Sequence, residues 1–373
     1  MHTGASAFFL IGLVLAATPC ADASELDISY RADQPSFRIH PAATGAQLPR
    51  LLEEYAPPPP PISTASEPAP ATASTGPFVY AWDRVRAGFA LPALESPLVV
   101  HWQKWYSERP ELMQAMFERG RRYIYHVVEE LDKRKLPTEL AFLPMVESGY
   151  NPMALSSAQA AGLWQFIPST GKAHDLKQSL LVDARRDIIA STAAALTYLQ
   201  TLFERFGDWQ LALAAYNSGE NAVAKAIARN KAKGLPTDYK ALDLPEETRN
   251  YLPKLQALKN IVANPRAFNF RIDPVPNKPY FAAIASERYI DVDVAAKLAG
   301  VTLEEFLALN PSFNLNLVSK GPRARILLPV EKIDAFISNL DNYKEPPKRN
   351  KPGNSKTTST PNAGASAGGA GVR

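Results

Sequence analysis

The sequence contains only one cysteine, Cys20, and that residue lies within a predicted export signal. An apolar run from Ala7 to Ala17 precedes Ala21-Asp22-Ala23, and this small-x-small pattern predicts cleavage before Ser24. The run is too short to span a bilayer. Cleavage at this point removes the cysteine, so we expect a mature chain without disulfides or thiol chemistry.

Cys20 also allows a second hypothesis, in which a lipidated cysteine becomes the mature N-terminus and holds the protein at the outer membrane. Pro19 lies directly before it and is a poor match to the small residue that such a site requires. We therefore favour a soluble, exported, periplasmic protein. Peripheral or lipid-anchored association with the outer membrane stays open as the alternative.

The sequence also lacks a large excess of either positive or negative charge. The 41 basic residues nearly balance the 37 acidic ones, and the net charge of +4 provides no strong nucleic-acid footprint. The histidines have no metal-ligand spacing, and the chain has no glycine-rich phosphate loop or local Ser/His/Asp arrangement. We therefore expect no metal, no cofactor and no nucleic acid partner. The histidines are His2, His40, His101, His126 and His174.

The composition divides the chain into two expected domains between extended ends. After a signal peptide at 1–23, residues 24–76 are rich in Pro and Ala and include five consecutive prolines, which predicts a disordered linker. The Lys/Pro-rich and then Gly/Ala-rich tail at 341–373 is also predicted to be disordered. Between them we expect a helical domain at 77–268 and a small module at 278–340.

Apolar residues in the larger domain recur at steps of three and four, which predicts amphipathic helices around a shared core. The expected helices include one from Pro137 to Glu147 and others over 188–203, 208–215 and 248–262. No strand–helix alternation is present, so a parallel α/β sheet is excluded as the main architecture. The sequence of the small module instead predicts a β-α-α-β unit that ends in a strand over 325–329.

Glu147 has an unusual setting for an acidic residue. It follows a mostly apolar segment and precedes Ser148-Gly149 and a turn-like Asn151-Pro152, so it lies near a helix end. A carboxyl in apolar surroundings is poorly solvated, and desolvation raises its pKa. Such a group can hold a proton near neutral pH and give it to a leaving oxygen. The ordinary alternative is a surface acid at the end of a helix.

Three further segments carry side chains suited to sugars. Gly162-Leu163-Trp164-Gln165 combines a glycine turn, a tryptophan that could be exposed and an amide, and Tyr216-Asn217 follows at the end of a helix. Tyr251 adds a phenol on a later helix. Sugar rings have apolar faces and hydroxyl edges, so aromatic faces and planar amides bind them well. No single segment is specific.

Taken together, the order Glu-Ser, Gly-Leu-x-Gln, Ala-Tyr-Asn and a helical Tyr resembles the motif set of lytic murein transglycosylases with a soluble-lytic-transglycosylase catalytic domain. The wider context, which includes 82–92 and 139–144, is similar to the D-type membrane-bound branch. The resemblance implies a mainly α, lysozyme-like fold. It also implies cleavage of the β-1,4 bond between N-acetylmuramic acid and N-acetylglucosamine in peptidoglycan glycan strands. The residue roles that it implies are Glu147 as the sole acid/base, and Ser148, Gln165, Tyr216, Asn217 and Tyr251 in substrate binding.

The count of carboxylates bears on the reaction. Hydrolytic glycosidases usually need two carboxylates around the scissile bond, whereas only Glu147 has a suitable setting here. Asp175, Asp183 and Asp187 are interpreted as helix-capping and salt-bridging residues. One carboxyl suffices if the substrate's own C6 hydroxyl attacks and closes a 1,6-anhydro ring. A lysozyme-type hydrolase and a non-catalytic wall-binding protein remain the alternatives.

The C-terminal module resembles a LysM domain, which binds chains that contain N-acetylglucosamine. The matching stretches are 294–302, 309–311 and 326–329. The usual Gly-Asp-Thr-Leu opening is replaced by Tyr289-Ile-Asp-Val-Asp293. Glycan binding and a purely structural role therefore stay open, and a module that only binds glycan could be deleted without loss of the chemistry.

Overall fold

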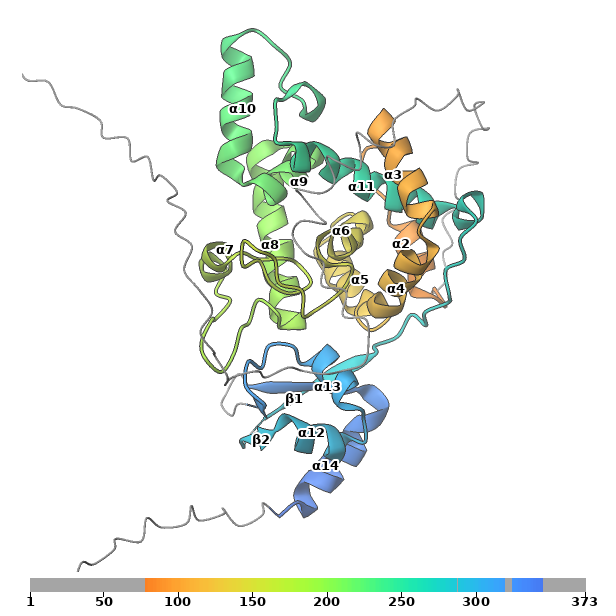
Figure 1. Ribbon diagram of the computed structural model, residues 1–373, viewed down its shortest axis with the longest axis vertical. Coiled ribbons are helices and arrows are strands. Elements are labelled where there is room, and N and C mark those ends of the chain that lie inside the picture. The colour runs from red at the N-terminus through yellow and green to blue at the C-terminus, as the bar shows by residue number, and fades with distance from the viewer. Residues whose placement is uncertain (1–77, 287, 319–323, 345–373) are drawn as a thin grey trace, which may run out of the picture. The chain divides into compact units, whose positions relative to one another are not determined.

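The computed structural model describes residues 78–286, 288–318 and 324–344 (Figure 1). The predicted signal peptide with Cys20, the Pro/Ala-rich linker and most of the predicted tail lie outside these residues. Within the described ranges, no helix is both long enough and apolar enough to cross a membrane.

The larger domain is built from ten α-helices, α2 to α11, among its described residues. This confirms the expected mainly α, lysozyme-like class and the helices predicted over 188–203, 208–215 and 248–262. The α-helices are α2 (Ala81–Ala87), α3 (Pro97–Ser107), α4 (Pro110–Gly120), α5 (Ile124–Lys133), α6 (Leu143–Ser148), α7 (Pro168–Ala173), α8 (Ile188–Phe206), α9 (Trp209–Ser218), α10 (Glu220–Ala232) and α11 (Glu246–Ala263). The 3-10 helices are η2 (Thr138–Phe142), η3 (Tyr239–Ala241) and η4 (Pro265–Phe268).

The helix predicted from Pro137 to Glu147 is two elements, η2 and α6. Pro144 lies in the first turn of α6, where its missing N–H is tolerated, and the same residue cannot continue the hydrogen-bonded ladder of η2. The second element, α6, ends at Ser148 and is capped by Gly149, whose φ of +58° favours glycine. A Cβ there would lie 2.9 Å from the Arg119 guanidinium, which donates a 2.7 Å hydrogen bond to the Gly149 carbonyl. Glu147 is thereby held at the end of a short helix.

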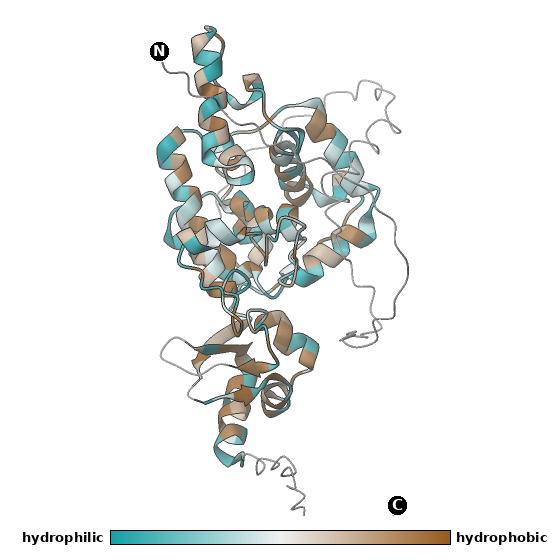
Figure 2. Ribbon diagram, turned by 60° about the vertical axis from the view of Figure 1, so that its left-hand side comes forward, coloured by the Kyte–Doolittle hydropathy of each residue, from teal (hydrophilic) through white to brown (hydrophobic). Residues whose placement is uncertain are grey.

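Aromatic side chains form part of the shared core that the apolar spacing predicted. Trp82 and Phe142 stack at 6.5 Å, and Trp102 is 2% exposed. Helix α11 packs against α3 and α9, and α8 packs against α9 and α5. Figure 2 shows hydrophobic and hydrophilic residues on the same helices, as amphipathic elements around a shared core require.

A buried ion pair joins three segments of this core. Glu139 of η2 is 0% exposed and accepts hydrogen bonds from the backbone N–H groups of Ala90 and Leu91. Lys259 of α11 lies 2.8 Å from the same carboxylate and also donates to the Leu91 carbonyl at 3.0 Å. The chain segment after α2, the segment before Glu147 and α11 are therefore fixed to one another.

The C-terminal module has the expected β-α-α-β order with three additions, a short β2–β3 pair, η5 and a final helix. Strand β1 pairs antiparallel with β4, with Phe281 opposite Pro329. The final helix extends to Asn342, beyond the predicted end of the module at residue 340. The elements are β1 (Phe281–Ala285), β2 (Ile290–Asp291), α12 (Val292–Ala299), α13 (Leu303–Leu309), β3 (Leu317–Val318), β4 (Arg325–Pro329), η5 (Val330–Lys332) and α14 (Ile333–Asn342).

Polar contacts connect the module to the helical domain. The Tyr123 hydroxyl donates to the Ala308 carbonyl at 2.8 Å, and Arg325 pairs with Asp187 at 2.7 Å. Backbone bonds also join the two parts, from Asp183 to Ser312 at 2.8 Å and from Asn314 to Leu181 at 3.0 Å. Apolar side chains of the module, Phe281, Leu309 and Leu327, belong to the same buried cluster as the helical domain. Truncation before the module is thus expected to expose core side chains, so point substitutions test the contact more cleanly.

The Arg122–Glu305 pair allows such a test. Both side chains are about one-fifth exposed, and the guanidinium donates to one carboxylate oxygen at 2.9 and 2.7 Å. Tyr280 donates to the other oxygen at 2.7 Å. Replacing Arg122 by Ala is expected to lower the free energy of unfolding by about 2 kcal/mol, because a largely buried carboxylate loses its cation. Urea unfolding of Arg122→Ala, Glu305→Ala and the double variant measures the coupling energy between the two side chains. If the losses in free energy of unfolding were additive, the two side chains would not stabilise each other.

Candidate active site

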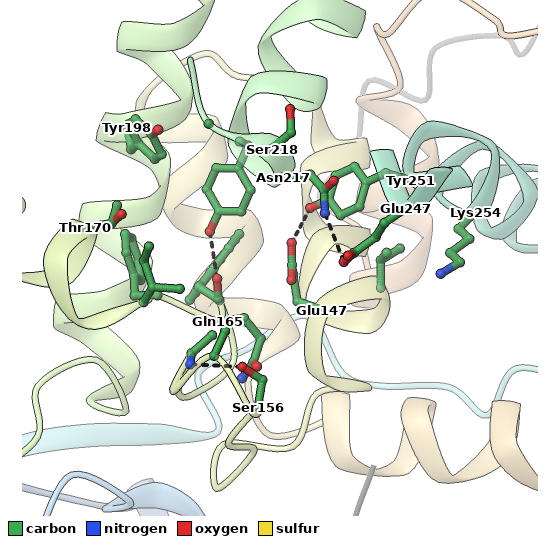
Figure 3. Close-up of a pocket in the computed structure, with 18 residues that line it drawn as sticks. Glu147, Ser156, Gln165, Thr170, Tyr198, Asn217, Ser218, Glu247, Tyr251 and Lys254 are labelled. Atoms are coloured by element: carbon green, nitrogen blue, oxygen red, sulfur yellow. Dashed lines mark hydrogen bonds between the residues drawn. The ribbon is translucent and has the colours of Figure 1, made fainter. Parts of the chain in front are cut away.

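A cleft of about 400 Å³ opens at the end of α6 (Figure 3). Its walls come from α6, from the loop before α7, from α7 itself, and from α8, α9 and α11. Five of the six residues predicted to form the site line this cleft. The lining residues that carry the argument below are Glu147, Gln165, Tyr198, Tyr216, Asn217, Glu247, Tyr251 and Lys254.

Glu147 has a carboxyl whose pKa is shifted toward neutral pH. Burial raises the pKa of its carboxyl from 4.5 to about 7, partly offset by a hydrogen bond from Tyr251. The charge of Glu247 raises the pKa further, and that of Lys254 lowers it. The Tyr251 hydroxyl donates to Glu147 Oε1 at 2.5 Å. A carboxyl with this pKa keeps a proton near neutral pH, as a general acid requires.

Gln165 is presented by a loop that requires a glycine. Gly162 has a φ of +82°, and a Cβ there would lie 2.3 Å from the Arg185 carbonyl oxygen. Gln165 itself has a φ of +49°, and its amide nitrogen donates to the Gly162 carbonyl at 2.8 Å. Arg185 supports the loop by donating hydrogen bonds to the backbone carbonyls of Gln159 and Phe166. Gln165 is therefore preorganised at the cleft wall.

The end of α9 supplies the opposite wall. The Tyr216 hydroxyl donates to the Trp164 carbonyl at 2.9 Å, and burial raises the pKa of this phenol well above its ordinary value. The Asn217 side-chain oxygen accepts from Thr248 at 2.7 Å, while its nitrogen lies 3.5 Å from a Glu247 oxygen. These neutral groups can position sugar hydroxyl and amide groups without competing for the proton.

Ser148 is the predicted site residue that does not line the cleft. It is 1% exposed, and its hydroxyl lies 3.0 Å from the Pro144 carbonyl and 2.9 Å from the Leu163 carbonyl. Both partners are acceptors, so the serine ties α6 to the Gln165 loop behind the cleft wall. This position supports a role in orienting Glu147 rather than in direct contact with a substrate.

Trp164, which the sequence allowed to be exposed, is buried. Its side chain is 0% exposed, and its indole N–H donates to Thr192 at 3.0 Å. The interpretation of two aspartates is confirmed, since Asp187 caps the N-terminus of α8 and Asp183 pairs with Arg185 at 2.7 Å. Asp175 is exposed and does not line the cleft.

Two cleft residues on α11 were missed from the sequence, Glu247 and Lys254. With Tyr251 they stand at i, i+4 and i+7, so they share one face of the helix. That spacing is the signal that would have found them once Tyr251 was placed in the site. Glu247 is exposed, and it brings a second carboxylate into the cleft.

Tyr251→Phe tests how the phenol acts on Glu147. The hydroxyl stabilises the ionised carboxylate, so its removal is expected to raise the pKa of Glu147 above about 7. The acid form then survives to higher pH, and the alkaline limb of the pH–rate profile moves upward. If Glu147 donates its proton in a reaction, the rate should also fall about tenfold, because the resulting carboxylate loses a charge-assisted bond. An unmoved alkaline limb would contradict this contact.

The fold and the cleft define a lysozyme-like helical protein whose cleft is lined by one half-buried carboxyl, that of Glu147. The transglycosylase SLT domain matches residues 125–237, and the LysM-like domain of lytic transglycosylase MltD matches residues 280–345. The chain belongs to the transglycosylase SLT domain family, with a C-terminal module of the MltD type.

Curated relatives extend this finding. Membrane-bound lytic murein transglycosylase D of Escherichia coli (strain K12) is 39% identical over 223 residues, 60% of this chain and 49% of that protein. A putative tributyltin chloride resistance protein of Alteromonas sp. (strain M-1) is 38% identical over 149 residues, 40% of this chain and 72% of that protein. A putative soluble lytic murein transglycosylase of Haemophilus influenzae is 36% identical over 116 residues, 30% of this chain and 19% of that protein. The chain thus spans about half the length of the transglycosylase D that it matches.

Proposed function

We propose that this chain is a peptidoglycan lytic transglycosylase that cleaves between N-acetylmuramic acid and N-acetylglucosamine. The observation that carries the proposal is Glu147, a carboxyl with its pKa raised to about 7 in a cleft lined by phenols and amides. The family membership and the names of the relatives, murein transglycosylases among them, support the same substrate class.

In the proposed mechanism Glu147 acts twice. It first gives its proton to the glycosidic oxygen as the bond from that oxygen to the muramyl C1 breaks. The N-acetyl group of the same sugar stabilises the positive charge that develops at C1. The Glu147 carboxylate then takes the proton from the C6 hydroxyl while that oxygen bonds to C1. A 1,6-anhydro ring forms, Glu147 is protonated again, and no water is consumed.

The surrounding residues hold these reactants in place. Gln165, Tyr216 and Asn217 position the muramyl sugar from the two walls of the cleft. Tyr251 stabilises the Glu147 carboxylate between the two proton transfers, and Ser148 fixes the end of α6 from behind. Preorganised groups of this kind lower the barrier, because little reorganisation is needed during the reaction.

A lysozyme-type hydrolase is the second candidate, and Glu247 is the observation that favours it. Two carboxylates that flank a bond are the usual requirement for hydrolysis with a positioned water. Glu247 is exposed on the first turn of α11, whereas Glu147 is half-buried. That contrast supports one acid/base rather than a matched pair. A non-catalytic wall-binding protein is the third candidate.

Product analysis separates the three candidates. Purified peptidoglycan is incubated with the protein, and the released muropeptides are identified by mass spectrometry. Anhydromuramyl ends support the proposed transglycosylase, free reducing ends support the hydrolase, and an intact substrate supports the binding protein.

We further propose that the enzyme works in the periplasm, at the cell envelope. The predicted signal peptide and the relative named as membrane-bound support an envelope location. Whether the protein is soluble or attached through Cys20 is tested by metabolic labelling with a fatty acid. Glycan binding by the LysM-like module is tested by sedimentation of the protein with purified cell walls.

A further inference from the structure

Lys254 brings a positive charge to one end of the cleft. It lies on α11 one turn beyond Tyr251 and lines the same cleft as Glu147. In the view of Figure 3 it stands on the side of Glu147 away from Gln165. The Gln165 side of the cleft is lined by neutral amide and phenol groups, whereas Lys254 adds a positive charge on its own side.

The Lys254 ammonium has no ion-pair partner within 4 Å and no side-chain hydrogen bond among the described residues. Its nitrogen lies 4.6 Å from the centre of the Trp102 ring, which holds the side chain in place. Burial lowers the pKa of this ammonium, while the more distant carboxylates of Glu247 and Glu147 raise it. The Lys254 side chain therefore lines the cleft while its ammonium has no direct hydrogen-bond acceptor among the described residues.

We propose that Lys254 is a specificity-determining residue that binds a carboxylate on the lactyl-peptide arm of the substrate. The inference rests on the proposed function, because it assumes a peptidoglycan strand in the cleft. N-acetylated sugar rings are neutral and supply no partner for an ammonium. N-acetylmuramic acid carries a lactyl carboxyl group, which is free in stem-less strands and amide-linked in strands that bear a peptide. The peptide stem carries carboxylates of its own.

This assignment explains why a costly group is kept at this position. An ammonium that is partly removed from water without a direct hydrogen-bond acceptor costs free energy in the unliganded protein. A bound carboxylate restores the charge-assisted hydrogen bonds that burial removes, so the gain appears as binding energy. Strands with a carboxylate near the scissile bond are then preferred over neutral strands of the same length.

Binding measurements on an inactive protein test the proposal without turnover. The Glu147→Gln protein and the Glu147→Gln/Lys254→Met protein are titrated by calorimetry with three ligands of equal sugar count. The ligands are a chitin oligosaccharide without carboxylates, stem-less glycan with free lactyl groups, and glycan that bears peptide stems. The Lys254→Met change is expected to weaken one or both anionic ligands about tenfold or more and the chitin oligosaccharide less than twofold.

The pattern of losses identifies the source of the carboxylate. A loss confined to stem-less glycan assigns the lactyl group, and a loss confined to stem-bearing glycan assigns the peptide. Equal changes for all three ligands, or none for any of them, would overturn the proposal. Failure of the Glu147→Gln protein to bind any glycan would instead overturn the proposed function together with the inference.

Two control variants guard against trivial explanations. Lys254→Arg keeps the charge and is expected to retain most of the preference for anionic ligands. Lys225→Met removes an exposed lysine of α10 that does not line the cleft, and it is expected to leave all three affinities unchanged. Near-ultraviolet circular dichroism of the Lys254→Met protein checks that Trp102 still packs. If Lys225→Met reproduced the effect, net charge rather than a specific contact would be responsible, and the proposal would fail.

Discussion

Glu147→Gln is expected to reduce glycan cleavage on the order of a thousandfold, because it removes the group that donates and then accepts the proton. The substitution keeps the size of the side chain and an oxygen that can accept the Tyr251 hydrogen bond. Fold and glycan affinity should therefore persist. Initial rates on purified peptidoglycan measure the effect, with affinity for stem-bearing glycan as the parallel reading.

Glu247→Gln is the matched control for this experiment. Glu247 is the other carboxylate that lines the cleft, and it is exposed near the start of α11. With Glu147 as the sole acid/base, this variant should retain activity within about tenfold of the wild type. A loss as large as that of Glu147→Gln would favour a two-carboxylate hydrolase.

The same Glu147→Gln variant is expected to be more stable than the wild type at alkaline pH. Between pH 4.5 and about 7 the unfolded chain releases the Glu147 proton while the folded chain retains it. The folded state is therefore progressively disfavoured as the pH rises through this window, by a total of about 3 kcal/mol. Glutamine carries no such cost. The difference in stability between Glu147→Gln and the wild type should be near zero at pH 4 and largest at pH 8. Thermal unfolding of both proteins at these two pH values measures it.

Glu139→Ala is expected to lower the free energy of unfolding by about 3–5 kcal/mol. The carboxylate is 0% exposed, and it serves two backbone N–H groups and Lys259. Its removal leaves a buried cation and two donors without their partner, which is costlier than the loss of the pair itself. Such a loss is a large fraction of the stability of an ordinary domain.

Glu108→Ala provides the control for an exposed pair. Glu108 is 54% exposed, and it lies 3.7 Å from Lys104 at the adjacent turn of α3. Exposed pairs of this kind contribute little, so a change below about 0.5 kcal/mol is expected. Urea unfolding compares the two variants under the same conditions. A Glu139→Ala loss no larger than the Glu108→Ala loss would show that the buried pair does not hold the three segments together.

The site could be predicted from sequence as far as local motifs define it. Apolar spacing predicted α8, α9 and α11, and the motif order predicted Glu147, Gln165, Tyr216, Asn217 and Tyr251, which the structure brings into one cleft. Tyr216, Asn217 and Tyr251 lie on the strongly patterned helices α9 and α11. Glu147 lies at the end of the short helix α6 and Gln165 on a loop, so these two were predicted from their local motifs rather than from helix patterning.

The rest depends on contacts between distant residues. Trp164 is buried because Thr192 accepts its N–H from another helix, and Ser148 turns away from the cleft because the Leu163 carbonyl lies behind it. Lys254 could be placed in the site only after the face of α11 that carries Tyr251 was known. These burials do not follow from residue type alone, whereas the break of the predicted helix at Pro144 does follow from the missing N–H of proline.

Cleavage in water enriched in oxygen-18 tests the central claim most directly. Internal attack by the C6 hydroxyl consumes no water, so the account predicts anhydromuramyl products that contain no heavy oxygen, formed at rates that depend on Glu147. Hydrolysis inserts one water oxygen at each new reducing end. Muropeptide mass spectra in which the newly formed ends carry oxygen-18 would contradict the single-carboxyl mechanism.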